Sequence, residues 1–242
     1  MLCRLFFTIA IIIFSLNAYT ISIDKMIAFA GDKITVKNDS DFAVFIKVNL
    51  SELNLKTGVE TPLNKMVFTK WPVYADRYSF VIDPKSSEQL NLTPIDSELG
   101  KQTQNDRIVG VSFVPESYKD DDKKSRYKLS MLIGFKTWYI IPNQKKTVEG
   151  DVSIEKTIKT GEYIFNNNTD TVVEFDVNTC KTKQHPKQCE ETIIALAHHH
   201  KKITLAGVTG GTIKVIARDK RNRFKKSLII DTANSLQKST TG

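Results

Sequence analysis

The fold is decided by residues 126–142, which read RYKLSMLIGFKTWYIIP. The first half of this stretch alternates apolar and polar side chains, the pattern of a strand with one buried face. Its apolar positions are Tyr127, Leu129, Met131 and Ile133. The second half is almost continuously apolar and ends at Pro142, which lacks the N–H that a sheet needs. Because the run is longer than most strands, we expect it to pass from a sheet edge into a more buried setting.

The rest of the chain repeats the same β pattern, with short alternating or β-branched runs between clusters of turn residues. Segments with helical periodicity are nearly absent. The alternating runs 33–38 and 42–50 flank Asp39-Ser40-Asp41, and we expect them to form a hairpin. Seven further strands are predicted at 153–158, 161–165, 172–178, 192–196, 201–205, 212–218 and 226–230. The predicted fold class is all-β, with two immunoglobulin-like β-sandwich domains.

The domain boundary is placed after Pro142 because residues 143–146, Asn-Gln-Lys-Lys, are short, polar and typical of a linker. The charged stretch 115–125 is too polar to bury and is predicted to be a loop between two strands. The predicted organisation is a signal peptide at 1–20, an N-terminal sandwich at 21–142, a linker at 143–146, a C-terminal sandwich at 147–234 and a tail at 235–242.

The first twenty residues have the pattern of a secretory signal peptide. Arg4 precedes the apolar run 5–14, which gives way to Ser15 before it reaches the roughly 20 residues of a membrane span. We therefore expect export to a periplasm and cleavage after Ala18 or Thr20. An uncleaved N-terminal anchor is the alternative.

Cleavage would remove Cys3 and leave two cysteines, Cys180 and Cys189. Because thiols oxidise in exported proteins, we expect these two to form a disulfide. A bridge that closes so short a loop is worth about 2–3 kcal/mol in the chain-entropy model. A metal site is the weaker alternative, since the spacing is not C-x-x-C and no second cysteine pair exists.

The charge pattern and the motifs argue against several functions. The net charge of +8 comes from lysines and arginines scattered among carboxylates, which favours solubility and acidic peptide partners over nucleic acid. No nucleophile elbow, phosphate loop or H-E-x-x-H motif occurs, so we expect neither an enzyme nor a cofactor. Neighbouring histidines of a strand point to opposite faces, so His198-His199-His200 is interpreted as a solvated loop and not as a metal site. Asp120-Asp121-Asp122, flanked by lysines, is interpreted as a hydrated loop.

A more particular pattern runs through the second half of the chain. Tyr139-Ile140-Ile141-Pro142 is followed by Tyr163-Ile164-Phe165-Asn166-Asn167-Asn168-Thr169 and then by the cysteine pair. Together with the signal peptide and the two β halves, this pattern resembles the periplasmic fimbrial (pilus) assembly chaperones of the chaperone–usher pathway. The nearest resemblance is to the divergent common-pilus and alpha-fimbrial type.

The resemblance implies donor-strand complementation, in which a chaperone lends a β-strand to an incomplete pilin sandwich. Main-chain hydrogen bonds would hold the subunit, and alternating apolar side chains would fill its open groove. By position before the proline, the donor residues here are Tyr127, Leu129, Met131 and Ile133. An ordinary strand, packed on its own domain, is the alternative for this segment.

The family also binds the subunit's C-terminal carboxylate with two basic residues, because charge-assisted hydrogen bonds to a carboxylate are strong. The second basic position matches Lys136, with one extra residue before Pro142. At the first position an ungapped comparison places Ile27, and Lys25 is the nearest basic residue. The chain departs from the family pattern there.

The implied partners are fimbrial subunits and an outer-membrane usher, with self-association when the chaperone is free. An alternative function is a surface-exposed immunoglobulin-like adhesive or structural protein. A metal-dependent enzyme or metal carrier is a third hypothesis. It predicts bound zinc or copper in the purified protein, and we expect none.

Overall fold

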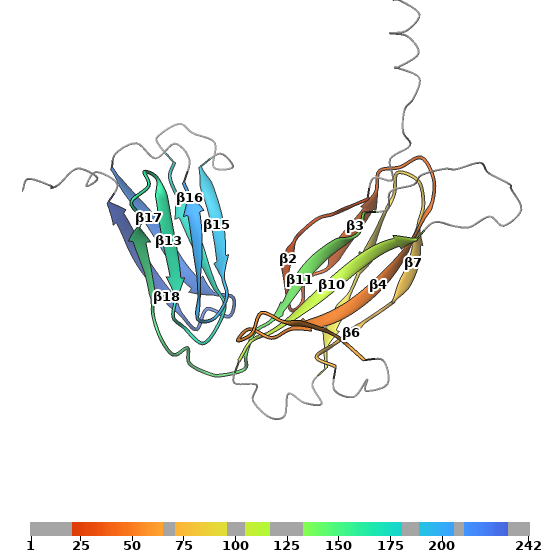
Figure 1. Ribbon diagram of the computed structural model, residues 1–242, viewed down its shortest axis with the longest axis horizontal. Helices are drawn as coiled ribbons and strands as arrows, with labels where there is room; N and C mark the ends of the chain where they lie inside the picture. Colours follow the sequence, from red (N-terminus) through yellow and green to blue (C-terminus); the bar gives the residue numbers. More distant parts are fainter. Residues whose placement is uncertain are drawn as a thin grey trace, which may run out of the picture. The chain divides into compact units, whose positions relative to one another are not determined.

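The computed structural model describes residues 21–64, 71–95, 105–116, 133–180, 189–205 and 211–231. The predicted signal peptide and C-terminal tail lie outside the described residues. All regular elements in the described ranges are β-strands, and none of these ranges holds a helix able to cross a membrane. The chain divides into two compact units (Figure 1). Unit 1 is Met1–Asp96 with Ile108–Ile140, and unit 2 is Ser97–Arg107 with Ile141–Gly242.

Unit 1 is a sandwich of two sheets. One sheet has the order β1-β3-β8, and the other has the order β2-β11-β10-β4-β5, with β7 also paired to β4. Two short strands, β6 and β9, form a further pair. The strands are β1 Ile21–Ile23, β2 Ile27–Phe29, β3 Ile34–Asn38, β4 Val44–Leu53, β5 Glu60–Pro62, β6 Val73–Ala75, β7 Ser79–Ile82, β8 Ser87–Leu90, β9 Leu92–Pro94, β10 Arg107–Glu116 and β11 Phe135–Ile141.

The core of unit 1 follows from strand alternation. Along β4, every second side chain from Val44 to Leu50 is buried, and Lys47 and Asn49 between them are exposed. Tyr139 is fully buried in the same core, and its hydroxyl donates a hydrogen bond to the Leu92 carbonyl at 3.0 Å. Removal of these apolar faces from water is the main stabilising contribution to the sandwich.

The predicted hairpin of 33–38 and 42–50 is wrong. Strand β3 pairs with β1 and β8 in one sheet, and β4 pairs with β10, β5 and β7 in the other. The turn between them therefore carries the chain across the sandwich. Alternation predicted each strand correctly, but both strands have one buried face, and this pattern does not distinguish a hairpin from a crossing between two facing sheets.

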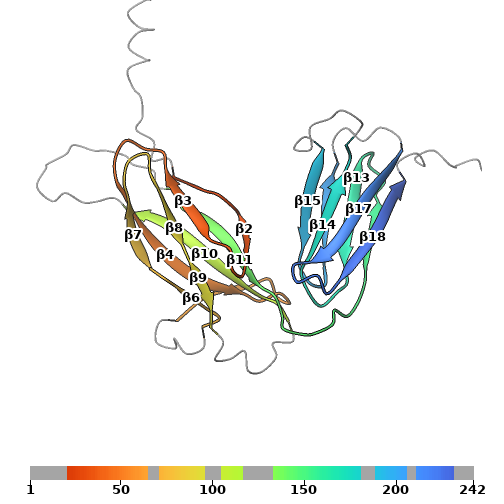
Figure 2. The same cartoon turned by 180° about the vertical axis from the view of Figure 1, so that it is seen from behind.

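Unit 2 is a second sandwich, with sheets ordered β12-β13-β16 and β15-β14-β17-β18. Figure 2 shows the second of these sheets, from β15 to β18. All seven strands predicted in this half are present. They are β12 Val152–Lys156, β13 Glu162–Asn167, β14 Val173–Asn178, β15 Glu190–Ala195, β16 His199–Thr204, β17 Thr212–Asp219 and β18 Lys225–Asp231. Phe165 and Phe175 meet edge to face in the core, with ring centroids 5.4 Å apart. The predicted fold class, all-β with two immunoglobulin-like sandwiches, is confirmed.

Candidate functional site

The C-terminal part of the deciding stretch is an interior strand. Figure 1 shows β11 between β2 and β10. Strand β2 runs parallel to β11 and pairs with it from Trp138 to Ile140. The Trp138 N–H donates to the Met26 carbonyl at 2.9 Å, and the Ala30 N–H donates to the Ile140 carbonyl at 2.9 Å. This portion is therefore covered on both sides.

The pairing of β11 with the N-terminal chain ends where that chain passes from one sheet to the other. Residues before β2 belong to β1, which pairs with β3 in the other sheet. Asp24 still follows β3, because its N–H donates to the Thr35 carbonyl at 3.1 Å. The first contact with β11 is made by Lys25, whose carbonyl accepts a hydrogen bond from the Thr137 hydroxyl at 2.9 Å. Among the strands that the structure describes, none pairs with residues 133–136 on this side.

The predicted donor residues can be placed only in part. Tyr127, Leu129 and Met131 lie outside the described residues. Ile133 is described, and 57% of its surface is exposed. The next residue, Gly134, passes close to β10, since a Cβ there would lie 3.1 Å from the Phe113 carbonyl oxygen. The donor role of these four residues stays a prediction.

Both predicted anchor residues lie near the point where pairing with β2 begins. The hydrogen bond from Thr137 to the Lys25 carbonyl places the backbone of Lys25 beside β11. If the parallel register of Trp138 with Ile27 is extended by two residues, Lys25 lies opposite Lys136. The Lys25 ammonium lies 3.8 Å from the Asp24 carboxylate, with about a third of each side chain exposed. Binding of a partner's carboxylate by these lysines stays a prediction.

The Lys136 ammonium has partners within unit 1. It forms an ion pair with the Glu60 carboxylate and lies 5.1 Å from the centre of the Trp138 ring. Glu60 also accepts a hydrogen bond from the Ser51 hydroxyl. The bonds from Lys136 and Ser51 lower the pKa of Glu60 below its usual range, so this carboxylate is ionised at neutral pH.

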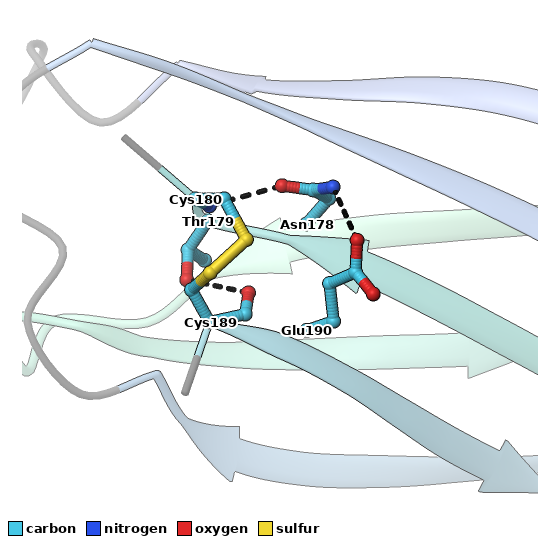
Figure 3. Close-up of a disulfide and its surroundings, with 5 residues drawn as sticks. All are labelled: Asn178, Thr179, Cys180, Cys189 and Glu190. Carbon is cyan, nitrogen blue, oxygen red and sulfur yellow. Dashed lines mark hydrogen bonds between the residues drawn. A yellow bond between two sulfur atoms is a disulfide. The ribbon is translucent and has the colours of Figure 1, made fainter. Parts of the chain in front are cut away.

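The predicted disulfide is confirmed. Cys180 and Cys189 are bonded to each other next to the ends of β14 and β15, which pair as neighbouring strands (Figure 3). Asn178 accepts a hydrogen bond from the Cys180 N–H and donates one to the Glu190 carboxylate, both at 2.9 Å. The bridge therefore joins the ends of two paired strands and lies outside the core cluster.

The histidine triplet spans the start of β16. His198 lies in the turn before the strand, with a positive φ of 58°, and all three side chains are exposed. His199 and His200 are the first residues of β16, so the predicted loop is wrong for these two. The His199 ring nitrogen Nδ1 lies 2.7 Å from the Ala197 carbonyl oxygen. Within the described residues, no group of three or more His, Cys, Asp or Glu side chains has a geometry that could hold a metal ion. The Asp120–Asp122 stretch lies outside these residues.

A turn in each unit is held by hydrogen bonds of a buried asparagine, which the sequence patterns did not predict. In unit 1 the Asn38 side chain donates to the carbonyls of Phe42, Ile82 and Asp83, and Ser40 binds back to it. In unit 2 Asn167 and Thr169 make the equivalent bonds. The available signal was the repeated spacing Asn-x-Ser/Thr directly after an alternating strand, at positions 38–40 and 167–169.

A buried polar cluster in unit 2 was missed as well. The Asp106 carboxylate accepts hydrogen bonds from the N–H groups of Asn143 and Val172 and from the Thr171 hydroxyl. Burial raises the pKa of Asp106, and these donors with the nearby Arg223 oppose that rise. Asn143, the first residue of the predicted linker, is itself only 1% exposed. No local pattern marks Asp106, because its donors are distant in sequence.

Comparison with known proteins places the chain among fimbrial proteins. Residues 22–142 match the family described as CS5 fimbrial protein N-terminal domain. An Escherichia coli protein, described as an uncharacterized 25.9 kDa protein in the CS5 3' region, is 29% identical over 195 residues. That alignment covers 76% of this chain and 80% of the other protein.

Solved structures of fimbrial chaperones are also similar to the chain. The class 5 fimbriae chaperone CfaA is 14% identical, with 88% of this chain and 99% of that chain covered and a TM-score of 0.46. The E. coli chaperone DraB is 12% identical, with 88% and 97% covered and a TM-score of 0.48. A chain from the Salmonella enterica complex of SafA pilin with the SafB chaperone is 12% identical, with 88% and 96% covered and a TM-score of 0.48. With half of its length matched by the family, the chain belongs to the CS5 fimbrial protein N-terminal domain family.

Proposed function

We propose that this protein is a periplasmic chaperone that holds fimbrial subunits by lending them the strand segment before Trp138. The observation that carries the proposal is the sheet change of the N-terminal chain at residues 24–26. Because β1 pairs with β3 and β2 pairs with β11 only from Trp138, Phe135 and Lys136 at the start of β11 have no described strand partner on the β2 side, and neither do residues 133–134 before the strand. An unpaired strand edge is a template for pairing with another chain.

The side chains near this edge suit an incomplete β-sandwich as partner. Ile133 is largely exposed, and it continues the alternation of Tyr127, Leu129 and Met131. Each such side chain contributes about 1.5–3 kcal/mol when a partner buries it fully. Lys136, with Lys25 beside β11, would bind the subunit's C-terminal carboxylate. Membership in a fimbrial protein family supports subunits of this kind as the partner.

Co-expression with a fimbrial subunit tests this function. We expect Ile133→Asp, and more strongly Leu129→Asp with Met131→Asp, to reduce the yield of soluble subunit and its co-purification with the chaperone. Val81→Asp is the matched control, because the exposed fraction of Val81, 55%, is similar to the 57% of Ile133. Val81 lies on another strand, β7. Equal subunit yield from the wild type and the donor-strand variants would contradict the proposal.

The remaining parts of the proposal concern export and delivery. Residues 1–20 would be removed as a signal peptide, which mass spectrometry of the periplasmic protein would show as a new N-terminus after Ala18 or Thr20. Residues 143–146 would link the two domains.

The chaperone would deliver its subunit to an outer-membrane usher, so deletion of the chaperone gene should abolish surface fimbriae in cells that still express subunit and usher. Retention of the protein at the cell surface without any subunit would instead favour the adhesive function.

A further inference from the structure

Glu60 and Lys136 form an ion pair although two other strands of the sheet lie between their own strands. In the sheet order, Glu60 on β5 and Lys136 on β11 are separated by both β4 and β10. Adjacent strands lie about 4.8 Å apart, so three steps amount to roughly 14 Å between the two backbones. The charged groups meet only if both side chains extend toward each other along the face of the sheet.

Small residues at the positions between them make this possible. Ser51 on β4 is directly opposite Gly110 on β10, and the Ser51 hydroxyl donates to the Glu60 carboxylate. A Cβ on Gly110 would lie 2.9 Å from Glu60 Oε1 and 2.6 Å from Ser51 Oγ. A side chain at position 110 would therefore push Glu60 away from its present place. The pair depends on a path across the sheet that only glycine leaves open.

The Glu60 carboxylate is ionised, and the ion pair is accessible. The bonds from Lys136 and Ser51 lower the pKa of Glu60, so that its carboxylate is charged at neutral pH. The Lys136 side chain is 35% exposed and the Glu60 side chain is 32% exposed. A carboxylate from another molecule can therefore approach the same ammonium, which has three N–H donors but already lies against Glu60 and the Trp138 ring.

We infer that Glu60 is a built-in competitor for Lys136, which a partner's C-terminal carboxylate displaces on binding. The inference rests on the proposed function, in which Lys136 binds that carboxylate. Two carboxylates at one ammonium repel each other, so the partner's carboxylate can bind only when the Glu60–Lys136 pair is broken. The free energy of that pair is therefore subtracted from the free energy of partner binding. The competition lowers the affinity for the partner and makes its release easier.

Binding of a synthetic peptide to the full-length protein tests the inference. The probe is a short, fluorescein-labelled peptide of alternating valine and threonine with a free C-terminal carboxylate, and its C-terminal amide is the reference. Exposed ion pairs contribute up to about 1 kcal/mol, so Glu60→Gln should bind the carboxylate peptide about two- to fivefold more tightly than the wild type. Its affinity for the amide peptide should not change.

Two further variants separate the effect from a change in net charge or in the anchor. Glu116→Gln is the matched control, because Glu116 lies on β10 of the same sheet and pairs with Lys47 at 3.5 Å. It should bind both peptides as the wild type does. Lys136→Met should bind the carboxylate and the amide peptide equally.

The outcomes distinguish the inference from the proposed function. If Lys136→Met loses the preference for carboxylate but Glu60→Gln binds no tighter than the wild type, Glu60 is no competitor and the anchor stands. If the wild type itself binds both peptides equally, or binds neither, the anchor fails and the inference fails with it. An equal gain from Glu116→Gln would also overturn the inference, since net charge would then account for it.

Discussion

The turn at Asn38–Phe42 in unit 1 and the turn at Asn167–Thr171 in unit 2 contain the same set of hydrogen bonds in different surroundings. In each, a buried asparagine amide donates to three carbonyls, and a hydroxyl two residues later binds the asparagine oxygen. In each, the turn carries the chain from one sheet of the sandwich to the other. Buried carbonyls need donors, and one side chain supplies them at both crossings.

The residues beside the two asparagines differ. In unit 1 Asp41 of the turn pairs with Lys85, with most of both side chains exposed. In unit 2 Asp170 is buried and binds the Lys145 ammonium at 2.7 Å, which raises the pKa of Lys145. Thr171 is buried too and donates to Asp106. The same local structure is thus a simple crossing in one unit and part of a buried polar network in the other.

The largest expected effect is on that network. Asp106→Ala would leave the N–H groups of Asn143 and Val172 without acceptors inside unit 2. We expect a loss of about 3–5 kcal/mol in the free energy of unfolding, measured by urea denaturation followed by circular dichroism. Asp41→Ala, in the exposed turn of unit 1, should change stability by less than about 0.5 kcal/mol. Similar losses for the two variants would show that the surroundings of the turns do not matter.

The next prediction tests whether the two turns are equivalent. Asn38→Ala and Asn167→Ala each remove a buried amide that donates to three carbonyls and accepts from a hydroxyl two residues later, and we expect each to lower stability by about 2–4 kcal/mol. Both tryptophans of the chain, Trp71 and Trp138, belong to unit 1. Tryptophan fluorescence should therefore detect the Asn38 variant, and circular dichroism should detect both. A loss confined to one of the two variants would contradict their equivalence.

The disulfide is a feature of unit 2 alone among the described residues. Replacement of Cys180 and Cys189 by serine should lower the free energy of unfolding by about 2–3 kcal/mol, because the unfolded chain regains the freedom of the closed loop. Urea denaturation with and without reductant measures this effect. The midpoint followed by tryptophan fluorescence should stay unchanged, and a shift of that midpoint would show that the bridge also stabilises unit 1.

The smallest expected effect concerns the ion pair of unit 1. Since the pKa of Glu60 is lowered on folding, its contribution is present above the unfolded pKa of about 4.5 and is lost as the pH falls through the folded value. About a third of the side chain is exposed, so Glu60→Gln should lower stability by less than 1 kcal/mol at neutral pH. The difference from the wild type should vanish in acid. A difference that persists well below pH 4.5 would contradict this ionic origin.

The features predicted correctly from the sequence are those that depend on local periodicity or on residue counts. The seven strands of unit 2 and the pairing of Cys180 with Cys189 were predicted, because alternation and cysteine count are local or compositional signals. The predicted pairing of β3 with β4 was wrong, because alternation indicates which face of a strand is buried but not which strand it pairs with. Asp106 was missed because its donors are 37 to 66 residues away in sequence.

For the candidate site, the division is similar. The sequence alone indicated an alternating strand before Pro142, two lysines and a relation to fimbrial proteins, since these depend on residue type and spacing. Only the tertiary structure decided that β2 covers β11 from Trp138 onward, and that Glu60 reaches Lys136 over Gly110. Strand pairing and contacts across a sheet join residues far apart in the chain, and their free energy depends on the whole sandwich being formed.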